Sequence, residues 1–299
     1  MVLDNLSEGH EEMVLTDNFV EGDLSNDDLL EDVFSSYSFD AVLHFAAHCK
    51  VGESVQDPLK YYRNNVMKGI TLIEVMLDNG VENLVFSSSA AVYGDPEEIP
   101  IPENHPKAPK NPYGQTKLML ERILGDFTSA YPLRAISLRY FNAAGSDPEG
   151  EIGEWHTPET HLIPLVLDAA SGRRENIEIY GTDYPTSDGT CIRDFVHVSD
   201  LATAHIRAVD SLLGTEDYGS WAFNLGAGRG HSVREVIQMV RSVTGKQFEV
   251  VEGDRRPGDP ARLVADPRKA RQELGWKPRF SNLEDIVRTA WDWHSRVDE

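Results

Sequence analysis

The sequence is poor in cysteine and in basic residues, and it has no long apolar run. Its two cysteines, Cys49 and Cys191, form no CxxC pair and belong to no cysteine–histidine cluster, so neither a disulfide framework nor a metal site is predicted. The net charge of −22 excludes nucleic-acid binding through a broad basic face. No apolar stretch reaches a transmembrane length, and residues 1–12 lack the apolar core of a secretory signal. We therefore expect a reduced, cytoplasmic protein that binds neither nucleic acid nor membrane.

The rest of the composition is that of an ordinary globular protein, with 40% hydrophobic and 26% charged residues in a chain of 299. Short β-type runs at 41–45, 83–88 and 134–138 alternate with helical patterns at 58–79 and 113–131. This alternation predicts an α/β fold with a doubly wound parallel sheet. Ligands of such sheets bind at the carboxyl ends of the strands, so polar groups just past strand ends are the first site candidates.

The pattern changes after Gly145, because residues 145–158 are rich in glycine, proline and acidic side chains. We expect residues 1–144 to form the sheet domain, with later segments returning to it. Residues 145–299 should form mainly a smaller lobe that faces the substrate, with clear helices at 232–244 and 283–295.

The sharpest local signal is the segment NPYGQTK at residues 111–117. Asn111 is a good N-cap and Pro112 suits the first helical position, so a helix should begin there. Tyr113 and Lys117 are four residues apart and share one face with Leu120, which is the expected buried face. The functional interpretation is that Lys117 stabilises the phenolate of Tyr113, and lowering a phenol pKa from about 10 to about 7 takes roughly 4 kcal/mol. The alternative is a core tyrosine beside a lysine whose ammonium reaches solvent.

A serine follows the predicted strand that precedes this helix. Ser89 lies 24 positions before Tyr113, in the segment FSSSAAVYG at residues 86–94. Its hydroxyl would approach the same substrate oxygen as Tyr113, as a proton relay requires. The alternative is a serine-rich loop whose hydroxyls satisfy backbone groups. The combination of strand-end serine and YxxxK is far more specific than either part.

Together these residues resemble the extended short-chain dehydrogenase/reductase superfamily, and within it most closely the UDP-glucose 4-epimerase family. The resemblance covers nearly the whole chain. It also includes LDNLS at 3–7, HFAA at 44–47, VGES at 51–54, YYRNNV at 61–66, YFN at 140–142, YGTDY at 180–184, RDFVHV at 193–198, FNLG at 223–226 and RRPGD at 255–259.

The resemblance implies a Rossmann-type NAD-binding domain at 1–144 and a nucleotide-sugar-binding lobe at 145–299. It implies that Ser89, Tyr113 and Lys117 are catalytic, and that Tyr113 takes the proton of the sugar 4-hydroxyl while hydride passes from C4 to tightly bound NAD. The 4-keto sugar then turns over and the hydride returns to its other face. The implied cofactor contacts are Asp4, Asn5, Ser7, Asp23, Leu24, Phe45, Ala46, Ala47, Asn65, Ser87, Tyr113, Lys117 and Tyr140.

On the substrate side the resemblance implies contacts to a UDP-sugar from Ser89, Asn142, His161, Leu162, Tyr180, Arg193, Arg256 and Asp259. Arg193 and Arg256 suit a diphosphate because guanidinium groups bind phosphate through paired hydrogen bonds, although either could instead form a surface ion pair. Leu263 matches a position that controls room for an N-acetyl group, and its intermediate size favours a hexose. The helices at 58–79 and 113–131 resemble those that join two subunits, so a homodimer is expected.

The sequence departs from the family pattern at its start. The family opens with a strand, a GxxGxxG loop and a helix that hold the pyrophosphate, and the sequence contains none of these. The missing strand would be central in the sheet, so its loss would remove ladder partners. We interpret the sequence as a truncated or mis-started form of a working epimerase, with a non-catalytic remnant as the alternative. Cys49 is a second departure, beside the expected nicotinamide position.

Two rival functions remain open from the sequence. A nucleotide-sugar 4,6-dehydratase shares the fold and the YxxxK motif, but its elimination step needs an acid and a base where this sequence has Ala90 and Ala91. A non-catalytic protein that binds nucleotide sugars is the other rival. Bound dinucleotide and the product formed from UDP-glucose would distinguish the three.

Overall fold

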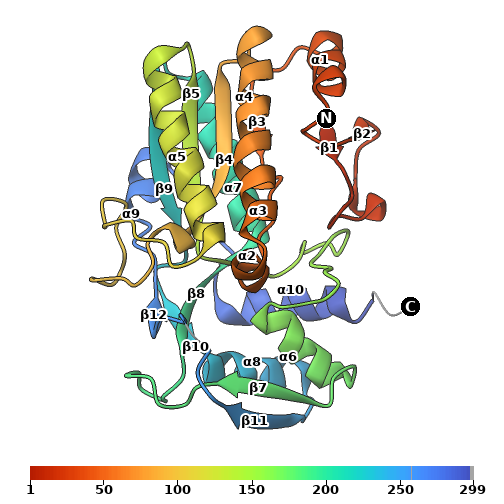
Figure 1. Cartoon of the computed structure of the whole chain (residues 1–299). Coiled ribbons are helices and arrows are strands. Elements are labelled where there is room, and N and C mark those ends of the chain that lie inside the picture. Colours follow the sequence, from red (N-terminus) through yellow and green to blue (C-terminus); the bar gives the residue numbers. More distant parts are fainter. Residues whose placement is uncertain (257, 297–299) are drawn as a thin grey trace. The chain divides into compact units, whose positions relative to one another are not determined.

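The computed structural model (Figure 1) describes residues 1–256 and 258–296, which divide into two units. Unit 1 comprises Met1–Gly94, Pro106–Arg139 and His205–Phe223, and unit 2 comprises Asp95–His105, Tyr140–Ala204 and the chain from Asn224 on. Each unit has its own buried apolar cluster. The assignment of NAD to the first part and of the sugar nucleotide to the second stays a prediction.

Unit 1 is built on a four-stranded sheet with helices packed along it. Its strand order is β3 (Val42–His44), β4 (Asn83–Ser89), β5 (Arg134–Tyr140) and β9 (Gly219–Leu225). Strands β3 and β4 are parallel, with His44 opposite Phe86. The helical elements are α1 (Asp27–Ser36), α2 (Val51–Gln56), α3 (Pro58–Tyr61), η2 (Tyr62–Met67), α4 (Lys68–Asp78), α5 (Pro112–Ala130) and α7 (Val198–Leu213). The expected parallel α/β arrangement is confirmed.

Two further strands of unit 1 form a sheet of their own. β1 (Val2–Asp4) pairs in parallel with β2 (Phe19–Glu21). In the part of the chain that the structure describes, β3 pairs along one edge only, with β4. A strand that pairs on one side leaves backbone groups of its other edge without ladder partners.

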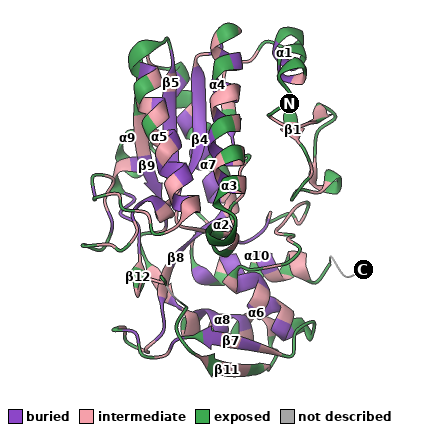
Figure 2. Cartoon of the chain, in the orientation of Figure 1, coloured by how far each residue is buried: buried purple, intermediate pink, exposed green. Residues whose placement is uncertain are grey.

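The core of unit 1 lies where β4 meets α4 and α5, and Figure 2 shows β4 buried along its length. Leu84 and Phe86 of β4 pack with Leu120 and Leu124 of α5, and each of the four is at most 1% exposed. The i, i+4 spacing of the two leucines confirms the predicted apolar face of this helix. The predicted helix at 58–79 is helical from Pro58 to Asp78, but η2 within it is a π-helix.

In the described part of unit 2 the strands form two separate sheets, with helices beside them. In one sheet β8 (Ile192–His197) lies between β10 (Gly230–Ser232) and β12 (Arg262–Leu263), and β6 (Asn142–Ala144) also pairs with β8. In the other, β7 (Asn176–Tyr180) pairs with β11 (Glu249–Gly253). The helices are α6 (Leu162–Ser171), α8 (Val233–Thr244), α9 (Arg268–Glu273) and α10 (Leu283–His294).

The helices predicted at 232–244 and 283–295 are confirmed as α8 and α10. α8 begins with a capping box, in which the Ser232 side chain accepts from the Glu235 amide and the Glu235 side chain accepts from the Ser232 amide. Among the described residues, no helix is both long and apolar enough to cross a bilayer.

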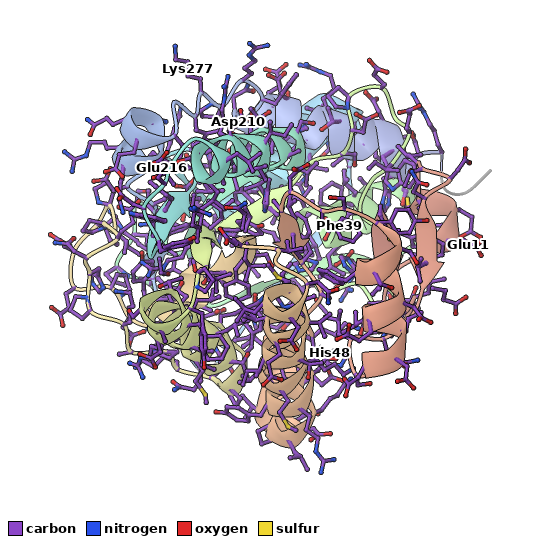
Figure 3. All side chains as sticks on the ribbon, turned by 90° about the horizontal axis from the view of Figure 1, so that it is seen from above. Glu11, Phe39, His48, Asp210, Glu216 and Lys277 are labelled. Atoms are coloured by element: carbon purple, nitrogen blue, oxygen red, sulfur yellow. The ribbon has the colours of Figure 1, made fainter. Side chains whose placement is uncertain are left out.

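The surface of unit 1 carries many acidic side chains. Glu11, Asp210 and Glu216, labelled in Figure 3, are examples of exposed acidic residues. Exposed like charges keep a protein dispersed in water, which agrees with the strongly negative net charge.

Candidate active site

Tyr113 and Lys117 lie on the first two turns of α5 and face the same way. The helix begins because Pro112 occupies its first turn and the Asn111 side chain accepts a hydrogen bond of 2.8 Å from the Gly114 amide. The Lys117 Nζ lies 5.9 Å from the centroid of the Tyr113 ring. The sequence prediction that the two side chains are neighbours is confirmed.

Ser89 ends β4 and meets Tyr113 directly. The Ser89 hydroxyl accepts from the Ala91 amide at 3.1 Å and lies close enough to Tyr113 to act on the pKa of its phenol. The first turn of α5 comes close to this loop because residue 114 is glycine. A Cβ at Gly114 would lie 2.6 Å from the Ala91 carbonyl oxygen, so a larger residue would push the helix away.

Lys117 is buried, with 4% of its surface exposed. Its Nζ donates to the Ser87 carbonyl oxygen at 2.8 Å and lies 5.0 Å from the centroid of the Phe86 ring. Burial lowers the pKa of Lys117 to about 8, because an ammonium loses its hydration in the protein interior.

In the chain without cofactor or substrate, the pKa of Tyr113 lies above that of a free phenol. Burial raises the pKa of Tyr113 to about 12, and the hydrogen bond from Ser89 offsets only part of this effect. The physical reason is that the ammonium of Lys117 is directed at the Ser87 carbonyl oxygen rather than at the phenol oxygen. Desolvation of the phenolate therefore outweighs the attraction of the neighbouring cation.

A cavity of about 190 Å³ opens at the carboxyl ends of β1, β2 and β3. Pockets for drug-sized ligands begin at roughly 300 Å³, so this cavity could hold only a part of a dinucleotide. Eight of the predicted cofactor contacts line it: Asp4, Asn5, Ser7, Asp23, Leu24, Phe45, Ala46 and Ala47. A cavity with carboxylates at strand ends and an apolar wall is suited to a nucleoside.

Asp23 is the electrostatic centre of this cavity. It accepts from the Lys68 Nζ at 2.7 Å and from the Asn5 Nδ2 at 2.6 Å. Burial acts to raise the pKa of Asp23, but hydrogen bonds from Lys68, Ser25 and Asn5 outweigh it and hold that pKa well below its usual value. Sequence reasoning missed Lys68, which lies one turn after Asn65 and thus on the same side of the helix.

Asn65 connects the loop after β3 to α5. It lies in the π-helical segment η2 and is 3% exposed. Its Nδ2 donates to the His48 carbonyl oxygen at 3.0 Å and to the Thr116 Oγ1 at 3.1 Å, while its Oδ1 accepts from the His48 amide at 2.9 Å. His48 lies beside the helical stretch that carries Asn65 (Figure 3). The side chain thereby fixes a strand-end loop next to the helix that holds Tyr113.

A buried charge network behind β4 was not predicted. The Glu121 carboxylate accepts from the Arg139 Nε at 2.8 Å, from the Arg139 Nη2 at 2.7 Å and from the Ser88 hydroxyl at 2.6 Å. Arg139 also donates to the Tyr93 hydroxyl at 2.8 Å. The signal was the arginine near the end of the strand at 134–140, because a buried arginine requires a buried carboxylate.

In unit 2, four predicted substrate contacts lie together: Tyr180, Arg193, Arg256 and Asp259. The Asp259 carboxylate lies 3.4 Å from the Arg193 Nη2 and 3.3 Å from the Arg256 Nε. The Arg256 guanidinium stacks 4.6 Å from the centroid of the Tyr180 ring. Both arginines are thus in ion pairs, and a second anion at this place would compete with Asp259.

Apart from Ser89, which belongs to unit 1, the other predicted substrate contacts lie elsewhere in unit 2. Asn142 donates to the Asp194 carbonyl oxygen at 2.9 Å. His161 immediately precedes α6, of which Leu162 is the first residue, and its imidazole contacts Glu154 and Glu159. Tyr140, a predicted cofactor contact, ends β5.

Leu263 and Cys49 are two further positions that the sequence analysis singled out. Leu263 of β12 pairs with Arg193 of β8, so the residue expected to limit the sugar is in register with a predicted diphosphate contact. Cys49 is exposed and has a free thiol.

A parallel α/β sheet with a strand-end serine, a tyrosine and a lysine one helical turn later defines the class of extended short-chain dehydrogenases/reductases. The sequence model of the family described as GDP-mannose 4,6 dehydratase matches residues 2–290. The UDP-glucose 4-epimerase from Halalkalibacterium halodurans is 50% identical to the chain, over 98% of this chain and 87% of its own length. The UDP-glucose 4-epimerase from Rhizobium meliloti is also 50% identical, over 100% of this chain and 90% of its own length.

A solved structure agrees with these relatives. The crystal structure of UDP-glucose 4-epimerase from Brucella ovis in complex with NAD has a TM-score of 0.93 and 49% identity, over 97% of this chain and 89% of that one. The chain belongs to the UDP-glucose 4-epimerase family.

Proposed function

We propose that this chain interconverts UDP-glucose and UDP-galactose through a 4-keto sugar with NAD as cofactor, a reaction of galactose metabolism. The observation that carries the proposal is the position of Ser89, at the end of β4, beside Tyr113 in the first turn of α5, with the buried ammonium of Lys117 one helical turn away. This arrangement offers one sugar oxygen both a proton acceptor and a hydrogen-bonding hydroxyl.

The chemistry that bound NAD would supply is reversible hydride transfer, from C4 of the sugar and back to the opposite face. The strand-end cavity of unit 1 would hold its adenosine part, with Asp4 and Asn5 toward the ribose and Leu24 against the base. A carboxylate near the ribose hydroxyls disfavours a 2′-phosphate, so NAD is favoured over its phosphorylated relative. Asn65, Ser87 and Tyr140 are the remaining proposed cofactor contacts apart from the catalytic pair.

The protein's own contribution is the movement of one proton. With a pKa of about 12, forming the Tyr113 phenolate at pH 7 requires about 7 kcal/mol, so the loaded site has to favour the anion strongly. The ammonium of Lys117 is the neighbouring cation for this purpose, and its burial keeps its field unscreened by water. Ser89 would hold the substrate oxygen against Tyr113 while the proton moves.

The uridine diphosphate would bind unit 2. We propose that Arg193 and Arg256 bind the diphosphate, since Asp259 already holds them within reach of one shared anion. Asn142, His161, Leu162 and Tyr180 would provide further contacts. Leu263, paired with Arg193, would leave room for a hexose more readily than for an N-acetylhexosamine.

The dehydratase alternative is weaker for a chemical reason. Elimination needs an additional acid and base next to the catalytic tyrosine, and the residues after Ser89 are Ala90 and Ala91. Neither side chain can carry a proton.

The decisive experiment is turnover of UDP-glucose by the purified chain with added NAD, followed by NMR of the sugar. The Tyr113→Phe variant should lose roughly 10²–10⁴-fold in rate while UDP binding, measured by calorimetry, changes by less than about twofold. Tyr37→Phe, at an exposed tyrosine, is the matched control and should keep full activity. Full activity in the Tyr113 variant would remove it as the base. A 4-keto-6-deoxy product would favour the dehydratase, and absence of both NAD binding and turnover would favour a non-catalytic protein.

We also propose that the protein is a cytoplasmic homodimer. Val51 and Val55 of α2, Leu59 of α3 and Met67 of η2 are apolar and 46–62% exposed. Exposed apolar side chains that gather on one part of a surface are typical of a subunit interface. The free thiols of Cys49 and Cys191 agree with a reducing compartment.

A further inference from the structure

Three titratable side chains of α5 lie on one helix face at successive turns: Tyr113, Lys117 and Glu121. Residues four apart on a helix are neighbours, with about 5–6 Å between their Cβ atoms. Both charged members of the row reach the end of β4. The Lys117 Nζ donates to the Ser87 carbonyl oxygen at 2.8 Å, and the Glu121 carboxylate accepts from the Ser88 hydroxyl at 2.6 Å. A lysine and a glutamate in these positions would ordinarily pair with each other.

They do not pair, because Arg139 of β5 occupies the carboxylate. Its Nε donates to the Glu121 Oε1 at 2.8 Å and its Nη2 donates to the Glu121 Oε2 at 2.7 Å. Two parallel hydrogen bonds of this kind are among the strongest contacts between a guanidinium and a carboxylate. The side chains of Arg139 and Glu121 are 4% and 8% exposed, so water hardly screens the pair. Among the described residues, the ammonium of Lys117 is bonded to the Ser87 backbone and not to a carboxylate.

We propose that Arg139 is a positioning residue for Lys117, because it neutralises Glu121 and so keeps the lysine ammonium available to Tyr113. This role rests on the proposed function, in which the field of that ammonium favours the Tyr113 phenolate. Without Arg139, the carboxylate of Glu121 would be a buried anion one helical turn from Lys117. Pairing with it would draw the ammonium away from Tyr113 and would cancel much of its field at the phenol.

The other titratable groups around Lys117 do not supply such an anion. They are Tyr113 on the same helix, His44 of β3 and Cys49 of the loop after β3, which carries a free thiol. Burial, and after it the charge of Lys117, lowers the pKa of His44 to about 3, so this imidazole is neutral at pH 7. Burial raises the pKa of Tyr113 to about 12, so the phenol is neutral too. Glu121 is therefore the carboxylate whose charge has to be compensated.

The test is the titration of Lys117, followed by NMR in the full chain isotopically labelled at the lysine Cε. It requires neither NAD nor a sugar nucleotide, and the Lys117 signal is the one absent from the Lys117→Met variant. In the parent the pKa should lie near 8. In Arg139→Met it should rise by about 1 to 3, as is typical when an opposite charge lies roughly 4–6 Å away. Arg139→Lys keeps a cation beside Glu121 and should restore most of the parent value.

The Glu121→Gln variant separates the effect of charge from the loss of a contact. It breaks the same ion pair but leaves no anion, so the pKa of Lys117 should stay unchanged or fall. In Glu121→Gln/Arg139→Met the pKa should return to the parent value. A rise of equal size in the two single variants, or an unchanged pKa in folded Arg139→Met, would overturn the proposal. If circular dichroism shows Arg139→Met to be unfolded, the double variant decides, and a Lys117 pKa unlike that of the parent would contradict the charge argument.

Turnover gives a second readout. Arg139→Met should lower kcat for UDP-glucose at least about tenfold, since a pKa change of one corresponds to a factor of ten, while KM stays within about twofold. The double variant should recover this loss. Arg288→Met, at an exposed arginine of α10 paired with Glu284 and Asp285, is the matched control and should change neither kcat nor the Lys117 pKa.

The two readouts distinguish this proposal from the proposed function. If the Lys117 pKa responds as described and the parent does not turn over UDP-glucose, the control of Lys117 by Arg139 is supported and the proposed function is wrong. If the parent is active and the Lys117 pKa is the same in folded Arg139→Met, the proposed function stands and the role of Arg139 is refuted.

Discussion

Replacing Lys117 by methionine should remove activity and at the same time stabilise the protein at neutral pH. The lysine is 4% exposed, and its pKa falls from 10.5 to about 8 on folding. Below pH 8 both the folded and the unfolded chain carry the proton, and burying the charge costs about 3 kcal/mol. Methionine has a similar shape and no charge. It therefore avoids this cost, although it also loses the hydrogen bond to Ser87, worth about 1 kcal/mol.

The pH dependence separates the charge from the hydrogen bond. Between pH 8 and 10.5 the unfolded chain binds a proton that the folded chain has released, so the stability of the parent rises with pH relative to the variant. The unfolding free energy of the parent minus that of the Lys117→Met variant should be about 2.5 kcal/mol larger at pH 10 than at pH 7. Above the unfolded pKa the electrostatic cost is gone.

Urea unfolding followed by circular dichroism at pH 7 and pH 10 measures this difference. Lys246→Met, at an exposed lysine of unit 2, is the control and should show a difference that hardly changes with pH. A Lys117→Met variant that is less stable than the parent at pH 7 by the same amount as at pH 10 would refute the reasoning. It would mean that the ammonium is hydrated or paired in the folded protein.

Three further changes test other parts of the structure. Glu121→Gln should lower the unfolding free energy by about 3–5 kcal/mol in scanning calorimetry because the buried charge of Arg139 loses the carboxylate of Glu121, and adding Arg139→Met should recover most of the loss. Strict additivity of the two changes would contradict the pairing. Arg256→Lys should weaken UDP binding about tenfold in calorimetry because the paired hydrogen bonds are lost, and an unchanged affinity would exclude this residue from the diphosphate site. Leu59→Asp should convert a dimer to a monomer in light scattering, whereas a persistent dimer would assign the interface to another surface.

The sequence predicted those parts of the fold that depend on local chemistry. The helix expected at 113–131 is observed at Pro112–Ala130, because its cap, its proline and its leucine spacing all lie within the segment. The contact between Tyr113, Lys117 and Ser89 was predictable for a related reason. Helical spacing fixes the first pair, and Ser89 lies at the carboxyl end of the strand that packs beside this helix.

Other features depend on partners that are distant in sequence or on the degree of burial. Glu121 and Arg139 lie on a helix and a strand, and nothing in either segment identifies the partner. The π-helical turns at Tyr62–Met67 have no signal in a pattern that reads as an ordinary helix. The pKa of Tyr113 also depends on burial, which raises it in the chain without ligands, and the degree of burial is a property of the folded packing.

The pairing of Glu121 with Arg139 also restricts how this protein can evolve. Replacing Glu121 or Arg139 alone by an apolar residue leaves the buried charge of the other without its counter-ion. Replacing both by apolar residues removes both charges from the interior. The residues at positions 121 and 139 should therefore covary. Across diverging descendants, a neutral residue at 121 is expected to accompany a neutral residue at 139, and intermediates with only one replacement should be rare.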